Sequence, residues 1–213
     1  MISDIIISVM EWVGTVSFTV SGALVAISCG LDLFGVIIVG GITAVGGGIL
    51  RDVLLGNVPP KIFENPWILG ISVITAIFVF WVAYIKRKGF STLREKTEMV
   101  NNFFDALGLA SFSITGIEMA CLSPHRDNIL LVITLGVITG VGGGILRDVL
   151  VNEKPYVLVK HVYAVASLAG CCLYYAFNEH KIFATFLTVI FIVAVRMLAA
   201  KFHWKLPKIK IDE

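Results

Sequence analysis

Charged side chains are scarce in this sequence, and their scarcity decides the class of the protein. Asp, Glu, Lys and Arg make up only 15% of the 213 residues, whereas 57% are hydrophobic and the mean hydropathy is +0.91. A water-soluble domain of this length needs a largely charged surface, which so few residues cannot provide. The composition therefore excludes a soluble globular protein and predicts an all-α integral membrane protein.

Motifs that would indicate a metal site, a disulfide framework or an enzyme are also missing. The four cysteines show neither CxxC spacing nor metal-ligand spacing with histidine, so we expect buried, inert thiols. No nucleophile stands beside a general base, so we expect neither an enzyme nor a cofactor beyond permeant K⁺ or Na⁺ ions. The basic residues gather at the ends of hydrophobic segments, which gives no support for nucleic-acid binding.

Long hydrophobic runs, in contrast, are abundant. The first one starts without the basic residues of a signal peptide and continues past signal-peptide length, so we expect it to be retained. Seven segments have about the length that a bilayer-spanning helix requires. They cover roughly residues 5–28, 34–55, 66–85, 102–122, 128–150, 157–177 and 182–200.

Lysine and arginine indicate the orientation of these segments. In a seven-span chain, three basic regions fall on the same side: the connection 86–101, the connection that holds Lys154 and Lys160, and the tail after residue 200. The opposite side offers mainly Lys61, Arg126 and Lys181. Because cytoplasmic loops carry the excess of positive charge, we predict a multi-pass cell (inner) membrane protein with its N-terminus outside and its C-terminus in the cytoplasm.

One stretch occurs twice. "TAVGGGILRDVL" begins at Thr43 and "TGVGGGILRDVL" at Thr139, and upstream of them "EWVGTVSFTVSG" from Glu11 aligns with "DALGLASFSITG" from Asp105. Each repeat contains three spans, so the second repeat must enter the membrane inverted relative to the first. We therefore predict a first three-helix repeat (1–85), a basic cytoplasmic connection (86–101), an inverted repeat (102–178), and a seventh helix with a basic tail (179–213).

The triple glycines predict irregular backbone in the second and fifth spans. Glycine weakens a helix, and freed carbonyls in a bilayer are tolerated only against protein or a water-filled cavity. Kinks or close helix crossings are expected, and plain packing of small residues is the alternative. The residues concerned are Gly46, Gly47, Gly48, Gly142, Gly143 and Gly144.

Hydroxyl side chains form a polar stripe in each repeat. One interpretation is a path for a partly hydrated ion, and the other is a set of hydroxyls that bond back to the preceding helical turn. The candidate pore-lining residues are Ser17, Ser21, Thr43, Ser111, Thr115 and Thr139.

Charged residues inside the spans are candidates for gating or for the pore mouths. These are Arg51, Asp52, Arg147, Asp148, Glu11 and Asp105. Neighbouring residues do not share a helix face, so we expect each arginine to bind freed carbonyls, Glu11 or Asp105 rather than the aspartate that follows it. A local salt bridge or an anchor at the membrane interface is the alternative. Glu118 is a weaker candidate for a functional charge, because Leu24 occupies the equivalent position in the first repeat. Arg196 is expected to be an interfacial anchor.

Two copies of "[DE]xxGxxSF[ST]x[ST]G", each followed by "VGGGILRDVL", resemble the prokaryotic trimeric intracellular cation (TRIC) channels, a family also described as a doubled glycine transporter domain. The resemblance implies a homotrimer among membrane lipids, with one monovalent-cation pore in each protomer and potassium as the expected ion. It also implies pore walls from the first, second, fourth and fifth spans, kinked at the glycine runs.

Two main functions remain open. A potassium-permeable channel would have modest K⁺/Na⁺ selectivity, because the chain has no TVGYG-like filter of backbone carbonyls. The alternative is a secondary transporter of a small zwitterion such as glycine, because transporters also use inverted repeats and broken helices. A scaffold without a pathway would leave the duplicated Arg-Asp pairs unexplained.

Overall fold

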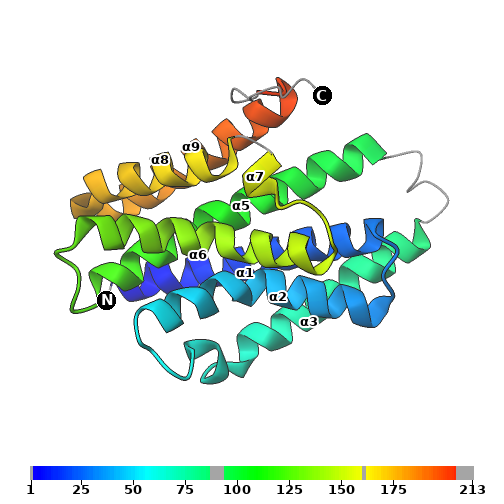
Figure 1. Cartoon of the computed structure of the whole chain (residues 1–213), viewed down its shortest axis with the longest axis horizontal. Helices are drawn as coiled ribbons and strands as arrows, with labels where there is room; N and C mark the ends of the chain where they lie inside the picture. The colour runs from blue at the N-terminus through cyan, green and yellow to red at the C-terminus, as the bar shows by residue number, and fades with distance from the viewer. Residues whose placement is uncertain (1, 87–93, 160–161, 205–213) are drawn as a thin grey trace, which may run out of the picture.

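The computed structural model describes residues 2–86, 94–159 and 162–204. Within these ranges the chain forms eight α-helices and two short 3-10 helices, and no strand is assigned, which confirms the all-α prediction (Figure 1). The α-helices are α1 (Ile2–Ser28), α2 (Leu33–Leu54), α3 (Pro66–Ile85), α5 (Arg94–Cys121), α6 (Ile129–Leu150), α7 (Tyr156–Val159), α8 (Tyr163–Ala176) and α9 (Lys181–Lys201). The 3-10 helices are η1 (Lys61–Phe63) and η2 (Asn178–His180).

Six of these helices are long and apolar enough to cross a membrane: α1, α2, α3, α5, α6 and α9. The sixth expected span, 157–177, differs, because α7 and α8 share it and α8 has only 14 residues. A helix of that length rises about 21 Å, less than the roughly 30 Å of a bilayer core. The protein is thus a multi-pass membrane protein, and the count of seven spans stays a prediction.

Helices α1 and α5 lie at the centre of the bundle. Helix α1 packs against α2, α3 and α5, and α5 packs against α6, α8 and α9. The most apolar part of α5 is 83% buried inside the protein, against 22% for α3 at the edge. Helix α5 begins at Arg94 rather than near residue 102, so it extends into the stretch expected to be a connection.

Contacts between the two halves are reciprocal. The ring of Phe18 on α1 covers Gly108 of α5, and the ring of Phe112 on α5 covers Gly14 of α1. The two rings also touch, with centroids 5.3 Å apart. Such an exchange of equivalent partners is the pattern that two-fold-related repeats would produce.

Helices α2 and α6 cross at the triple glycines, again reciprocally. A Cβ atom on Gly47 would collide with the carbonyl oxygen of Thr139, and a Cβ atom on Gly143 would collide with that of Thr43. Only glycine allows the two backbones to approach so closely. Both helices keep helical secondary structure through these runs. The expected kinks stay a prediction, since a helix can bend at glycine without ending there.

Part of the basic pattern used for orientation lies outside the described residues. This applies to Arg87, Lys88, Lys160, Lys205, Lys208 and Lys210, and to the side chains of Arg94 and Lys96. The direction of the chain across the membrane therefore remains a prediction.

Candidate functional site

Arg147, in the last turn of α6, connects three helices. Its side chain is fully buried, and its Nη1 donates to Asp105 Oδ1 on α5 and to Ser21 Oγ on α1, both at 2.7 Å. Its Nε donates to Asp148 Oδ1 at 2.8 Å. A charge can be buried at this depth only when carboxylates compensate it, and Arg147 has two of them.

Asp105 also binds a second arginine. Arg196 Nη2, from α9, lies 3.3 Å from Asp105 Oδ2, and the Tyr163 hydroxyl lies 3.4 Å from Oδ1. Arg196 is only 3% exposed, so its expected role as an interfacial anchor is wrong. It is buried because α9 packs against α5 and presents this position to Asp105. We call Arg147, Asp148, Asp105, Arg196 and Tyr163 the Arg147 cluster.

The equivalent group in the first repeat is looser. Arg51 Nε lies 2.9 Å from Asp52 Oδ1, but Arg51 Nη1 is 3.8 Å from Glu11 Oε1. The side chain of Glu11 is 27% exposed, whereas that of Asp105 is fully buried. We call Arg51, Asp52 and Glu11 the Arg51 cluster.

Both arginines bind the aspartate that follows them, as the alternative of a local salt bridge predicted and contrary to the prediction from helix geometry. The prediction treated side chains as projecting straight from the helix, but an arginine is long enough to fold back and place Nε beside its neighbour. The expected pairing with Glu11 and Asp105 is also present. Each arginine therefore uses both kinds of partner.

The two aspartates also hold the connections that follow their helices. Asp52 Oδ2 accepts the backbone N–H of Lys61 at 3.0 Å, and Asp148 Oδ2 accepts that of Tyr156 at 2.7 Å. Each Arg-Asp pair thus joins the end of its helix to the connection after it and to the first helix of its own repeat. This is a reason for the pair to recur that the sequence alone did not reveal.

The candidate pore-lining hydroxyls are all buried in this conformation. Four of them bond back to carbonyls of their own helix at 2.6–3.1 Å: Thr43, Ser111, Thr115 and Thr139. Ser21 instead donates to Asn101 Oδ1 at 2.8 Å and accepts from Arg147. The packing alternative therefore describes most of the stripe in this conformation.

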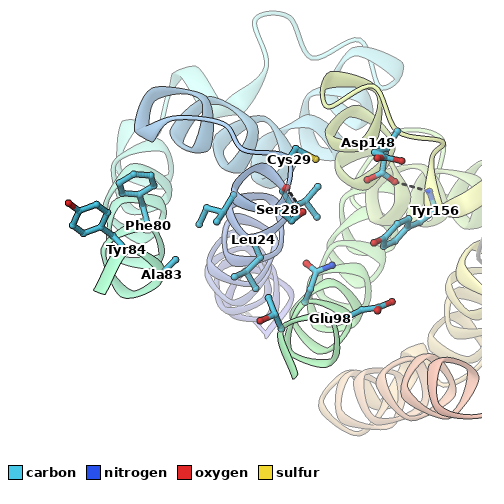
Figure 2. Close-up of a pocket in the computed structure, with 14 residues that line it drawn as sticks. Leu24, Ser28, Cys29, Phe80, Ala83, Tyr84, Glu98, Asp148 and Tyr156 are labelled. Carbon is cyan, nitrogen blue, oxygen red and sulfur yellow. Dashed lines mark hydrogen bonds between the residues drawn. The ribbon is translucent and has the colours of Figure 1, made fainter. Parts of the chain in front are cut away.

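A cavity of about 950 Å³ opens beside Asp148 (Figure 2). Its walls come from the ends of α1, α3 and α6 and from the start of α5. Three carboxylates, Glu98, Asp148 and Glu153, line it, and its described lining residues include no Lys or Arg. Phe80, Tyr84 and Tyr156 add aromatic rings. We call it the Asp148 cavity.

A second cavity of about 250 Å³ opens at the other end of α1 and is called the Glu11 cavity. It carries both signs of charge, from three acids and two bases. These are Glu11, Asp52, Glu64, Arg51 and Lys61.

The segment of α1 between the two cavities is largely buried inside the protein. Thr15 lines the Glu11 cavity and Leu24 lines the Asp148 cavity. Between them, Phe18 and Ser21 are fully buried, the first against Phe112 and the second against Arg147. Arg147 and the aromatic pair thus pack against the part of α1 that lies between the two cavities.

Sequence reasoning missed several residues of this region. Asn101 precedes Asp105 by one helical turn and continues its stripe, and it was overlooked because the span was expected to start at 102. Tyr163 and Arg196 left no local signal, because their contact with Asp105 joins elements far apart in the chain.

Glu118 belongs to a separate ion pair. Lys181 Nζ lies 2.8 Å from both of its carboxylate oxygens, and the Tyr174 hydroxyl donates to Oε1 at 2.8 Å. The carboxylate is fully buried and ties α5 to α8 and α9. It lines neither of the two cavities described above.

Known proteins resemble the chain over nearly its whole length. A family model described as "Glycine transporter" matches it twice, at residues 8–84 and 102–179. The UPF0126 inner membrane protein YadS of Escherichia coli is 33% identical over 96% of both chains. The UPF0126 membrane protein YvgT of Bacillus subtilis is 34% identical over 92% of both.

Solved structures also match the chain over nearly its whole length. A prokaryotic TRIC channel crystallised in 0.5 M KCl superposes with a TM-score of 0.83 at 35% identity, covering 95% of this chain and 99% of that one. The TRIC orthologue from Rhodobacter sphaeroides superposes with a TM-score of 0.82 at 30% identity, covering 93% and 98%. With its doubled glycine motif, its bundle around α1 and α5 and these similarities, the chain belongs to the prokaryotic TRIC channel family, whose sequence model is described as a glycine transporter.

Proposed function

We propose that the protein is a monovalent-cation channel, permeable to potassium, with one path inside each protomer between the Glu11 cavity and the Asp148 cavity. One observation carries the proposal: the two cavities lie at opposite ends of α1, and each is lined by the aspartate of one Arg-Asp pair. The similarity to solved TRIC cation channels supports it.

The path is closed in the described conformation. Arg147 binds Ser21, whose other partner Asn101 lines the Asp148 cavity, and a fixed cation in a narrow cation path is an electrostatic barrier. Opening requires Arg147 to leave Ser21 and Asp105, and Phe18 to separate from Phe112. The hydroxyls of the stripe would then become available to ions. Bending at the triple glycines would allow this movement without ending the helices.

The charges of the Asp148 cavity suit cations. Carboxylates in a concave, low-dielectric site raise the local concentration of cations and repel anions. Selectivity between K⁺ and Na⁺ is modest, since the path has hydroxyls and carboxylates rather than a ring of fixed backbone carbonyls.

The same proposal includes the architecture. Two inverted three-helix repeats, with kinks at the glycines of α2 and α6, are followed by a seventh helix, and three copies form a homotrimer in the cell membrane. The reciprocal contacts of Phe18 with Gly108 and of Phe112 with Gly14 support the repeats. The orientation, with the N-terminus outside and the C-terminus in the cytoplasm, rests on the distribution of Lys and Arg.

A second candidate is transport of a small zwitterion such as glycine. The Glu11 cavity favours it, because its acids and bases could bind an ammonium and a carboxylate together. Its volume of about 250 Å³ suits a small ligand.

Purified protein in planar bilayers and in vesicles separates the two functions. The channel predicts discrete single-channel currents, with a reversal potential in a KCl gradient that indicates cations over anions and little difference between K⁺ and Na⁺. Saturable glycine counterflow without unitary currents would support the transporter instead and overturn the channel.

A further inference from the structure

We propose that Arg196 of α9 is a standby partner for Asp105: it competes with Arg147 for this carboxylate and so makes it easier for Arg147 to leave. The inference rests on the proposed channel function, in which departure of Arg147 opens the path. It gives α9, which stands outside the repeats, a part in gating. Arg196 would act as a positioning residue, through Asp105, without touching the permeant ion.

The two arginines make contacts of unequal length with the Asp105 carboxylate. Arg147 Nη1 is 2.7 Å from Asp105 Oδ1, whereas Arg196 Nη2 is 3.3 Å from Oδ2. Arg147 thus makes the short contact in this conformation, and Arg196 makes a long one. The guanidinium of Arg196 stays beside the carboxylate because it lies over the Tyr163 ring, 4.5 Å from its centroid.

Both arginines have unused donors. Arg147 Nη2 and Arg196 Nε are buried without a hydrogen-bond partner among the described residues. A buried donor without an acceptor is unfavourable, so a further hydrogen bond to Asp105 would stabilise either arginine. The carboxylate can therefore shift towards Arg196 when Arg147 moves away.

Counting charges gives the direction of the effect. The Arg147 cluster holds two cations, Arg147 and Arg196, and two anions, Asp105 and Asp148. When Arg147 leaves, Arg196 still compensates one of the two carboxylates. Without Arg196, Asp105 would remain sealed in the protein with no cation, which is strongly unfavourable, whereas Asp148 borders the Asp148 cavity. Arg196 also repels Arg147 in the closed state. Both effects favour opening.

The Arg51 cluster differs, because among the described residues no second arginine forms an ion pair with Glu11, and the other nearby cation, Lys61, lines the Glu11 cavity. Glu11 meets Arg51 at 3.8 Å and faces a cavity, where water or ions can compensate its charge once Arg51 moves. A standby cation is needed only where the carboxylate is sealed, as Asp105 is.

The test is single-channel recording of the full chain in planar bilayers. Arg196→Gln removes the charge and keeps a polar side chain, and its open probability should fall by at least about fivefold with unit conductance unchanged. Arg196→Lys keeps the charge and should restore much of the loss. Tyr163→Phe keeps the ring and removes the hydroxyl contact with Asp105, so it should lower open probability in the same direction by a smaller factor.

Two further variants separate competition from general packing. The double variant Glu118→Gln with Lys181→Gln removes a second ion pair between α5 and α9, that of the buried Glu118 carboxylate, without leaving a lone charge, and should keep the parental open probability. In an Arg147→Ala background, Arg196→Gln should no longer lower open probability, because no arginine at position 147 competes for Asp105.

Other outcomes would overturn the inference. A rise in open probability for Arg196→Gln would mean that Arg196 holds Arg147 in place, and unchanged gating in Arg196→Gln and Tyr163→Phe would mean that it only packs. Either result overturns the inference while the channel function stands. If Arg196→Gln does not assemble, as judged by size-exclusion chromatography, parental gating in Tyr163→Phe overturns it. A parent chain that carries no current would instead reject the proposed function.

Discussion

Arg147 and Asp105 form a fully buried ion pair, with Nη1 2.7 Å from Oδ1. The equivalent pair of the first repeat, Arg51 with Glu11, is 3.8 Å apart and borders a cavity. Two repeats with the same motif have thus produced one sealed cluster and one loose cluster. The difference comes from α8 and α9, which contribute Tyr163 and Arg196 to one side only.

Replacing the two arginines should therefore have unequal effects. Arg147→Ala leaves two buried carboxylates with one cation and is expected to lower the free energy of unfolding by about 3–5 kcal/mol. Arg51→Ala should lower it less, since Glu11 is partly exposed. In variants that assemble, both changes should raise open probability or cation conductance, with opposite rectification.

Thermal unfolding in detergent and bilayer recording measure these effects. Arg126→Ala is the control, because its contact with Asp127 is exposed and contributes little. Arginine variants that assemble normally and conduct like the parent would show that Arg51 and Arg147 do not gate the path.

The glycine crossing should not tolerate a single methyl group. Gly47→Ala and Gly143→Ala each drive a Cβ atom into a carbonyl oxygen of the facing helix, which is expected to destabilise the protein by about 1–3 kcal/mol. Gly70→Ala on α3 is the matched control, since its Cβ would meet no atom within 4 Å. Equal melting temperatures for all three variants would contradict the close crossing.

The hydroxyl stripe should be accessible only in the open state. After the native cysteines are replaced, cysteine at position 17, 21, 111 or 115 should react with a small hydrophilic thiol reagent, and block current, only when the channel opens. Ser28→Cys should react in both states, because Ser28 lines the Asp148 cavity and is exposed. Protection at all four positions in a conducting channel would assign the stripe to helix packing.

The carboxylates of the Asp148 cavity should concentrate cations at that mouth. Glu98→Gln with Glu153→Gln is expected to reduce cation current that enters from this side at low ionic strength. The reduction should fade near 1 M salt, where the Debye length is about 3 Å. Glu179→Gln, exposed on η2, is the control. A loss of current that does not depend on salt would argue for a structural role of these glutamates.

Much of the architecture was readable from the sequence. The scarcity of charge and the hydrophobic runs predicted a helical membrane protein, because only a helix of sufficient length satisfies its own backbone in lipid. The doubled motif predicted equivalent positions in two repeats, and Phe18 and Phe112 do occupy equivalent, mutually packed positions. An acidic partner, Glu11 or Asp105, was one of the two kinds of partner predicted for the arginines, and Arg147 does pair with Asp105.

Only the tertiary structure decided that the Arg147 cluster is sealed and that the Arg51 cluster is not. Nothing in the local sequence of α9 indicates that Arg196 reaches Asp105, because that contact depends on how α9 packs against α5. The same holds for the hydroxyls, whose sequence pattern suits a pore wall and a packed helix equally. Periodicity reports which face of a helix is polar. Whether that face meets water, another helix or a buried charge is determined by long-range packing, and here it meets Arg147 at Ser21.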